Sequence, residues 1–204
     1  MRWLRRSTPL RDIRRSFEQA AADEEHFPST IDPRIYHVQL ILRYFGDLSG
    51  RRVADIGSGK GRFARVLKDA HPGASLVAFD LAEAMLKVVS SDIAPCCGSM
   101  TALPFLSASF DAAYATESLE HAVDIETAIR EMCRILKPGG KLVIIDKNAE
   151  HWGRLKTPAW EKWFHRNELE KLLRRHCSHV ESEFLSYWED VPPDGMFIAW
   201  KAIL

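Results

Sequence analysis

The sequence has no excess of charge, no paired cysteine spacing and no long apolar run. Its 204 residues hold 28 Lys plus Arg and 28 Asp plus Glu, so no overall field attracts nucleic acid or a membrane surface. Cys96, Cys97, Cys133 and Cys177 form no C-x-x-C pair, which argues against a zinc site or a disulfide framework. No apolar stretch reaches the roughly 18 residues that span a bilayer, and arginines stand where a secretory signal has its apolar core. We therefore expect one soluble, cytoplasmic domain with reduced cysteines, no membrane insertion and no nucleic-acid partner.

The most informative stretch is a glycine-rich turn. Residues 53–61 read Val-Ala-Asp-Ile-Gly-Ser-Gly-Lys-Gly, an apolar run that ends in an acid and leads into three glycines at alternate positions. Such a run is typical of a buried parallel strand that stops at a tight turn, and the apolar spacing of residues 62–68 predicts a helix after it. Unpaired N–H groups at a helix start favour negative charge, and glycine lets a ligand approach the main chain. The stretch therefore predicts a ligand-binding loop.

Asp55 indicates which ligand this loop accepts. Its carboxylate would repel a pyrophosphate but can hold the ammonium group of a zwitterionic amino acid. The dinucleotide pattern G-x-G-x-x-G requires glycine at position 62, where the chain has Arg62, and the phosphate loop pattern fails because Gly61 follows Lys60. A nicotinamide oxidoreductase is therefore disfavoured, whereas a generic Rossmann-type turn remains an alternative.

A second strand with a terminal acid follows. Residues 75–80 read Ser-Leu-Val-Ala-Phe-Asp, and Asp80 stands 23 positions after Gly57. A carboxylate at this strand end can accept hydrogen bonds from both hydroxyls of a ribose in the crevice shared with the glycine loop. Asp80 also suits the N-cap of a helix over residues 82–86. The two roles are compatible, and we predict the ribose role.

These motifs resemble the class I S-adenosylmethionine (SAM) dependent methyltransferases, in particular the ubiquinone/menaquinone-biosynthesis family. The acid followed by G-x-G-x-G at Asp55 resembles the first motif of that class. The other matching segments are Leu103-Pro104-Phe105, Ser109-Phe110-Asp111, the stretch 116–124 and Leu136-Lys137-Pro138-Gly139-Gly140. In the last of these, proline stops a helix and the glycines form the turn into the next strand. The resemblance is close over residues 50–148.

The resemblance implies an α/β fold and SAM as the cofactor. The fold would be a Rossmann-like, doubly wound, seven-stranded, mostly parallel sheet with helices on both faces and an antiparallel last strand. Ser99 stands where the family usually has aspartate; as a neutral acceptor for the adenine amino group it contributes on the order of 1 kcal/mol, less than a charged acceptor. We therefore expect weaker cofactor affinity than is usual. The residues expected to contact the cofactor are Asp55, Gly57, Ser58, Gly59, Asp80, Leu81, Ser99, Met100 and Thr116.

The candidate catalytic residues are Glu117 and His121. They follow the fourth predicted strand, whose end faces the reaction centre in open α/β sheets. They stand four positions apart and would share one face if the segment is helical. Together they could form a general base, or they could form only a local hydrogen bond that fixes the loop.

The whole chain, 1–204, reads as a single methyltransferase domain in four parts. Residues 1–48 are expected to form a helical lid, 49–148 the SAM-binding core, 149–165 an acceptor-side connection, and 166–204 a helix and a hairpin. The arginines of residues 1–16 could belong to a transit peptide, an acidic-substrate patch or a solvated arm, and we favour the arm. The aromatic residues Trp152, Trp160, Trp163 and Phe164 could line an acceptor pocket or pack as core, and we favour the pocket.

The function predicted from the sequence is methyl transfer from SAM to a small molecule by in-line displacement. Nothing in the sequence requires a metal. The arginines and tryptophans suggest an aromatic or anionic acceptor, whereas the atom methylated and the oligomeric state are not predicted. The alternative is a SAM-binding regulatory or scaffold protein without transfer activity, which the Ser99 departure permits.

Overall fold

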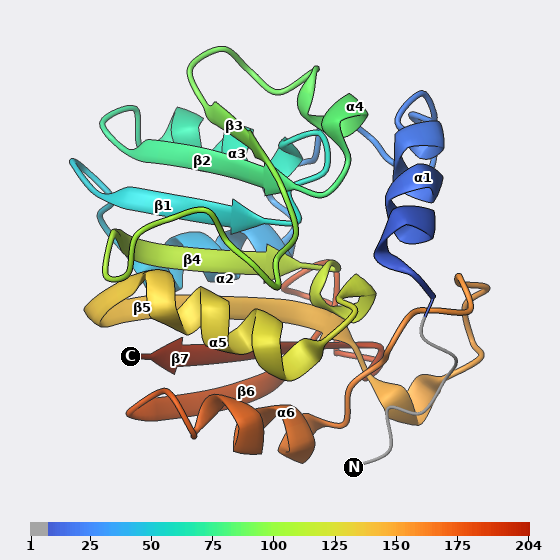
Figure 1. Cartoon of the computed structure of the whole chain (residues 1–204). Helices are drawn as coiled ribbons and strands as arrows, with labels where there is room; N and C mark the ends of the chain where they lie inside the picture. The colour runs from blue at the N-terminus through green and yellow to red at the C-terminus, as the bar shows by residue number, and fades with distance from the viewer. Residues whose placement is uncertain (1–7) are drawn as a thin grey trace.

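The computed structural model describes residues 8–204, and these form a seven-stranded sheet with helices on both faces (Figure 1). The strand order is β3-β2-β1-β4-β5-β7-β6. Strands β1 to β5 run parallel to one another, and β7 is antiparallel to both β5 and β6. The predicted fold, including the antiparallel last strand, is therefore confirmed. The strands are β1 Arg52–Ile56, β2 Ser75–Asp80, β3 Ala94–Cys97, β4 Phe110–Thr116, β5 Leu136–Lys147, β6 His179–Leu185 and β7 Phe197–Ile203.

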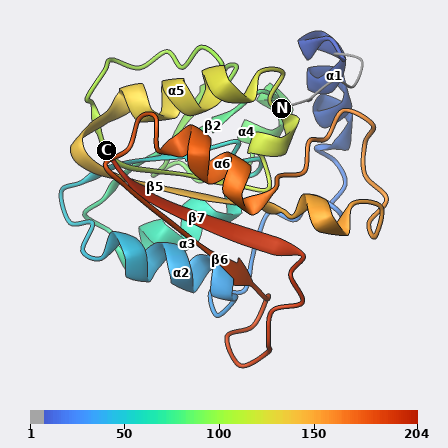
Figure 2. The same ribbon diagram turned by 90° about the horizontal axis from the view of Figure 1, so that it is seen from below.

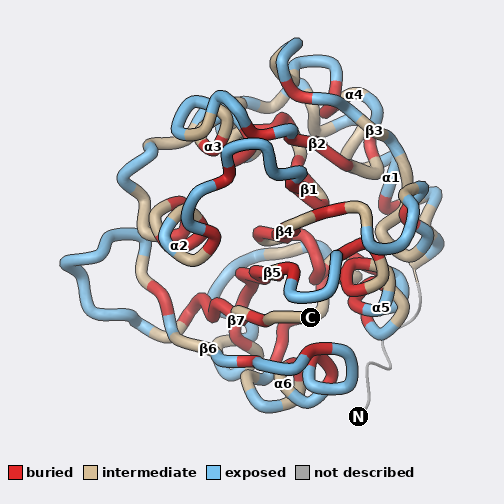
Figure 3. Tube along the Cα trace, turned by 90° about the vertical axis from the view of Figure 1, so that its left-hand side faces the viewer, coloured by how far each residue is buried: buried red, intermediate tan, exposed pale blue. Residues whose placement is uncertain are grey.

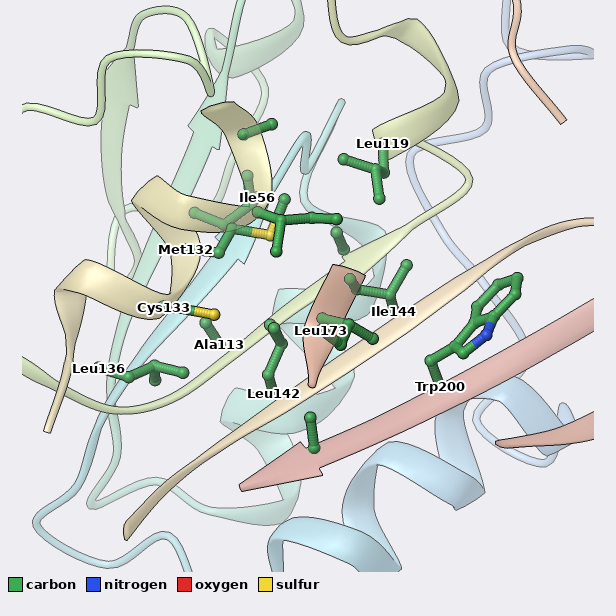
Figure 4. Packing of buried hydrophobic residues seen from close by; sticks show 14 of the residues in the cluster. Ile56, Ala113, Leu119, Met132, Cys133, Leu136, Leu142, Ile144, Leu173 and Trp200 are labelled. Atoms are coloured by element: carbon green, nitrogen blue, oxygen red, sulfur yellow. The ribbon is translucent and has the colours of Figure 1, made fainter. Parts of the chain in front are cut away.

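Two layers of helices cover the sheet, α2 and α3 on one face and α5 and α6 on the other (Figure 2). The central strands are buried between them (Figure 3), because apolar residues point to both faces, as a doubly covered parallel sheet requires. On the α5–α6 face, Met132 and Leu173 pack against Ile144 and Trp200 (Figure 4). The helices are α1 Leu10–Ala20, α2 Tyr36–Phe45, α3 Arg62–Ala70, α4 Glu83–Leu86, α5 Ile125–Ile135 and α6 Arg166–Leu173, with 3-10 turns η1 Leu119–His121 and η2 Ala149–His151.

The turn at the start of β5, over residues 136–140, has the geometry that its proline and glycines predict. Gly139 adopts a φ of 75°, in the left-handed region that glycine tolerates. A Cβ at Gly140 would lie 2.8 Å from the carbonyl oxygen of Lys137. The turn also pairs with the chain end, since the N–H of Gly139 donates to the carbonyl of Leu204 at 3.1 Å. These contacts set the register in which β5 enters the sheet.

The two N-terminal helices have different positions, so the lid expected over residues 1–48 is only partly possible. Helix α1 lies beside the carboxyl ends of β1 and β2 (Figure 1). Its Glu18 accepts hydrogen bonds from the N–H groups of Glu83 and Ala84, both at 2.9 Å, which ties α1 to the start of α4. Helix α2 instead packs into the core beneath the sheet through Val38 and Ile41. The lid therefore remains a proposal for α1 and the segment after it, and α2 is not part of it.

No helix in the described residues is both long enough and apolar enough to cross a membrane.

Candidate functional site

A cavity of about 310 Å³ opens where β1, β2, β4 and β5 end. Open α/β sheets bind their ligands at this edge, and a volume of this size lies within the ~300–1,000 Å³ of small-molecule sites. The wall combines the glycine loop, the strand ends, one side of α1 and part of the connection after β5. The residues used below that line it are Phe17, Gly57, Ser58, Gly59, Arg62, Asp80, Leu81, Ser99, Met100, Thr116, Glu117, Glu120, His121, Lys147, Pro158 and Glu161.

The glycine loop is held against the end of β2 by its own backbone. The N–H groups of Gly57 and Ser58 donate to the carbonyl oxygen of Phe79 at 2.7 and 3.0 Å. A Cβ at Gly57 would lie 2.3 Å from the Cβ of Ser118, whereas a Cβ at Gly59 would meet nothing within 4 Å. Gly57 thus permits close packing inside the protein, and Gly59 leaves open space in the cavity wall. The sequence predicted that the loop glycines let a ligand approach the main chain. Of Gly57 and Gly59, it is Gly59 that has open space beside its backbone.

Asp80 connects the glycine loop to the segment before α4. One carboxylate oxygen accepts from the N–H of Gly59 and the other from the N–H of Ala82, both at 2.8 Å. Burial raises the pKa of Asp80, and these two N–H groups oppose the rise. Since α4 begins at Glu83 and Glu18 satisfies its first N–H groups, Asp80 is not the N-cap of this helix. Its carboxylate lines the cavity, which leaves the predicted ribose role open.

The cavity also contains the other residues expected near a nucleoside. Leu81, Ser99, Met100 and Thr116 all line it. The hydroxyl groups of Ser99 and Thr101 hydrogen-bond to each other at 2.7 Å, and Met100 packs partly against the core. Three segments that are distant in the sequence therefore meet the glycine loop at one site.

Asp55, by contrast, does not reach the cavity. Its side chain points into the layer beneath the sheet, where Asp55 is 1% exposed, and neither carboxylate oxygen has a hydrogen-bond partner in residues 8–204. Burial raises its pKa to about 7, and the nearby Tyr114 hydroxyl opposes the rise. The prediction that Asp55 directly holds an ammonium group does not fit this position, because residues alternate between the two faces of a strand.

Replacing Asp55 is expected to change how stability depends on pH. The folded-state pKa is raised above the ordinary value of 3.8 to about 7, so the folded protein retains a proton that the unfolded chain has lost. Stability should therefore fall as pH rises from about 4 to about 7, by a few kcal/mol. Asp55→Asn should remove this part of the decrease, so urea unfolding should favour the variant increasingly from about pH 4.5 to pH 8. Parallel pH profiles for both proteins would contradict this account.

Glu117 and His121 both line the cavity, but they do not share a helical face. Glu117 has a φ of 48°, a left-handed conformation that is strained for a residue with a side chain and that clusters at functional sites. The short 3-10 turn η1 then covers Leu119–His121. The helical arrangement that the sequence suggested for this pair is therefore wrong, because the left-handed residue turns the chain out of helical geometry.

Both ring nitrogens of His121 have neighbours that limit its use as a base. The indole N–H of Trp160 donates to Nδ1 at 3.3 Å, and since that N–H can only donate, the proton of the neutral ring lies on Nε2. Nε2 lies 3.5 Å from Glu120 Oε1 and 4.0 Å from Glu161 Oε1. Burial lowers the pKa of His121 to about 3. His121 is thus a neutral group fixed by its neighbours, and this arrangement favours the structural alternative over the catalytic one.

A buried cluster of charged residues, of which Glu120, Lys147 and Glu161 line the cavity, forms its inner wall, and no sequence motif indicated this cluster. Lys147 forms an ion pair with Glu120 and lies 3.8 Å from Glu161 Oε2, while Asp146 accepts from the backbone N–H of Glu120 at 3.1 Å. Burial raises the pKa of Glu120 well above its ordinary value and that of Asp146 to about 6. One signal was available: β5, like β1 and β2, is an apolar run with an acid near its end.

Glu120, His121 and Glu161 offer ligand atoms within 4.8 Å of one another, yet their arrangement does not suit a metal ion. A metal ligand must be the unprotonated nitrogen of a neutral histidine, and Nε2 of His121 carries the proton. Lys147 already brings a positive charge to both glutamates. We therefore treat the cluster as a polar wall.

A second, smaller cavity of about 230 Å³ adjoins the first and shares Arg62 and Glu117 with it. The Arg62 guanidinium lies 3.8 Å from the Glu117 carboxylate. His37 lines this space, stacked on Tyr187 at 5.0 Å, and neither ring nitrogen has a partner in the described residues. Burial lowers the pKa of His37 to about 4, so the ring is neutral.

None of the four aromatic residues predicted for the pocket wall lines the cavity, and two of them are core residues, which corrects that prediction. Trp163 and Phe164 are buried against the sheet, and Trp152 packs edge-on against Trp163. Pro158 and Glu161, rather than the tryptophans, line the cavity. The connection after β5 therefore contributes Pro158 and Glu161 to the cavity wall.

The N-terminal arginines show no contact with the cavity where they are described. Arg11, Arg14 and Arg15 are exposed on α1 and do not line the cavity. Arg2, Arg5 and Arg6 lie outside the described residues. The solvated-arm hypothesis stays a prediction for that segment.

Comparison with known proteins shows similarity to methyltransferases over part of the chain. Residues 54–144 match the family model described as methyltransferase domain. A demethylmenaquinone methyltransferase of Renibacterium salmoninarum is 36% identical over 122 residues, which are 58% of this chain and 51% of that protein. The chain thus spans about half the length of this curated relative.

Two solved structures share the fold at low sequence identity. The [4+2]-cyclase SpnF superposes with a TM-score of 0.77 at 17% identity, covering 94% of both chains. Phosphoethanolamine N-methyltransferase 2 of Haemonchus contortus, solved with SAM, gives 0.76 at 15% identity, covering 96% of this chain and 60% of that one. The sequence match covers residues 54–144, less than half of the chain, and the solved structures share its fold, so the chain is similar to the class I SAM-dependent methyltransferases.

Proposed function

We propose that this protein transfers a methyl group from SAM to a small-molecule acceptor. The observation that carries the proposal is one cavity that joins the glycine loop and Asp80 at one end to a buried polar wall at the other. A bound sulfonium supplies an activated methyl group. The protein has to align the acceptor's lone pair behind that methyl group and exclude water, and such orientation contributes several kcal/mol.

The residues present fit the cofactor. The open space at Gly59 lets a ligand lie against the main chain, Asp80 can accept from the ribose hydroxyls, and Leu81, Ser99 and Met100 would surround the adenine.

Because Asp55 does not line the cavity, another group must hold the amino-acid end. Arg62 and Glu117 carry opposite charges, line both cavities and lie 3.8 Å apart. We infer that this pair holds the zwitterionic amino-acid end of SAM, called its tail below.

Glu117→Gln distinguishes this tail-binding role from the catalytic role that the sequence suggested. If Glu117 pairs with the ammonium group, the variant should lose about tenfold in affinity for both SAM and S-adenosylhomocysteine, since a charged hydrogen bond contributes about 1.5–3 kcal/mol. Calorimetric titration with both nucleosides measures this. Unchanged affinities together with a reduced turnover would instead make Glu117 the general base.

The function itself is tested with cofactor first and acceptor second. SAM at about 100 times its Kd should stabilise the fold by about 2.7 kcal/mol, which raises the melting temperature by roughly 5–10 °C in a chain of this size. NAD should give no shift. Methyl-labelled SAM incubated with a metabolite extract should then yield a labelled small molecule. A protein that SAM does not stabilise would refute the proposal.

A SAM-binding protein without methyl transfer is the second candidate. Ser99 replaces the acid expected at the adenine, and SpnF, a protein of the same fold, is named a cyclase. This candidate predicts stabilisation by SAM with no labelled product from any extract.

A further inference from the structure

We propose that the inner end of the cavity takes an acceptor with a protonated amine, that Glu120 receives its proton, and that the nitrogen is then methylated. This inference rests on the proposed methyltransferase function and adds the acceptor class and a catalytic residue. It stands on the polar wall formed by Glu120, Lys147 and Glu161, on Asp146, which contacts Glu120, and on the apolar residues beside the wall.

The charge of this wall favours a cation. Glu120 and Glu161 bring two carboxyl groups to the wall and Lys147 brings one ammonium group. Asp146 adds a third carboxyl group, which does not line the cavity but accepts from the N–H of Glu120. Glu120 is 1% exposed, Asp146 0%, Glu161 5% and Lys147 7%. His121 contributes no positive charge because its ring is neutral. Buried charges are costly unless paired, so the wall lacks positive charge when its carboxyl groups ionise. An ammonium group supplies that charge, whereas an anionic acceptor would add to the repulsion.

One buried carboxylate oxygen beside the cavity has no hydrogen-bond partner in the described residues. Oε1 of Glu120 pairs with Lys147, but Oε2 has no hydrogen-bond partner in the described residues, although Glu120 lines the cavity. The backbone of Glu120 is fixed at both sides, since its N–H donates to Asp146 at 3.1 Å and its carbonyl accepts from Lys162 at 3.0 Å. An unpaired buried oxygen costs free energy, and an N–H donor from a ligand would remove that cost.

The body of the acceptor is expected to be apolar. Phe17, Ala122, Val123 and Pro158 line the same part of the cavity, and the Phe17 ring packs against His121 at 4.9 Å. The positive groups nearby are occupied, since Lys60 pairs with Glu24 and Lys147 with Glu120. An amine on an aromatic or aliphatic body therefore fits better than a carboxylate or a phosphate.

The reaction balances without another reactant. The ammonium group gives one proton to the Glu120 carboxylate, which leaves a neutral nitrogen with a lone pair. A bond forms between this nitrogen and the methyl carbon, while the carbon–sulfur bond breaks and its electron pair remains on sulfur. The products are the methylated ammonium ion and S-adenosylhomocysteine.

A second cation that this wall can bind is the sulfonium of SAM. The variant Glu120→Gln distinguishes the amine from the sulfonium, because each explanation predicts the loss of a different binding affinity. We suggest measuring SAM and S-adenosylhomocysteine binding by calorimetry, and benzylamine, benzyl alcohol and benzoate binding to the S-adenosylhomocysteine complex by NMR titration. These probes share their ring and differ in charge. Benzylamine should bind wild type at least tenfold more tightly than the other two.

In Glu120→Gln this preference for benzylamine should disappear, while the ratio of SAM to S-adenosylhomocysteine affinity stays as in wild type. Glu126→Gln is the matched control, because Glu126 is exposed on α5 and outside the cavity; it should behave as wild type. Glu161→Gln, which should weaken benzylamine binding, provides a second test if Glu120→Gln fails to fold.

Several results would overturn the inference. If Glu120→Gln weakens SAM but not S-adenosylhomocysteine, the wall holds the sulfonium. Equal binding of the three probes, or a labelled methyl group found on oxygen or carbon, would also exclude an amine acceptor while leaving the methyltransferase function intact. Failure of the protein to bind either nucleoside would instead refute the proposed function.

Discussion

Gly57→Ala is expected to destabilise the fold by about 2–5 kcal/mol. Alanine at a φ of 77° costs about 1–2 kcal/mol, and its Cβ would lie 2.3 Å from the Cβ of Ser118, an overlap that costs about 1–3 kcal/mol more. The overlap is hard to relieve, because the buried Ser118 hydroxyl donates to the carbonyl of Ile56 at 2.7 Å. Urea unfolding of wild type and variant measures the difference.

Gly50→Ala is the control that separates the two causes. Gly50 has a φ of 68° and no atom within 4 Å of an added Cβ, so only the backbone cost of about 1–2 kcal/mol applies. If Gly57→Ala is no more destabilising than Gly50→Ala, close packing of the loop on Ser118 is not what requires the glycine.

Asp80→Asn is expected to lower the affinity for both SAM and S-adenosylhomocysteine by about 30–100-fold. The amide retains one oxygen for a backbone N–H, but it loses the charge and one acceptor. Charged hydrogen bonds contribute about 1.5–3 kcal/mol, and tenfold in affinity corresponds to about 1.4 kcal/mol. Because the ribose is common to both nucleosides, calorimetry should show the same loss for each.

Asp69→Asn removes an equal charge from an exposed position on α3 and should leave both affinities as they are. Unchanged affinities in Asp80→Asn would leave Asp80 with the structural role alone, as the link between Gly59 and Ala82.

The sequence predicted well those features that depend on neighbouring residues. Apolar runs that end at glycine or at an acid mark β1 and β2, and the proline and glycines after α5 mark the start of β5, because turn geometry depends on residues adjacent in the chain. The resemblance then supplied the number of strands and the antiparallel last strand, which no local pattern contains.

The sequence also indicated which segments meet at the carboxyl edge of the sheet. Ser99, Met100 and Thr116 meet Asp80 and the glycine loop at one cavity, since parallel strands bring their carboxyl ends to the same edge. Asp55 was misplaced because the motif gives its position along the strand but not the face on which its side chain lies.

The sequence by itself determined a doubly wound α/β domain with acids and glycines at its strand ends, because strand ends and glycine turns depend on short segments of neighbouring residues. Only the tertiary structure decided what the acceptor end consists of. Glu120, Lys147 and Glu161 come from three segments, and burial makes their charges effective by removing them from water. Likewise, the Trp160 N–H fixes which ring nitrogen of His121 carries the proton, and the left-handed conformation of Glu117 fixes the course of the chain after β4. Residue spacing predicts neither feature.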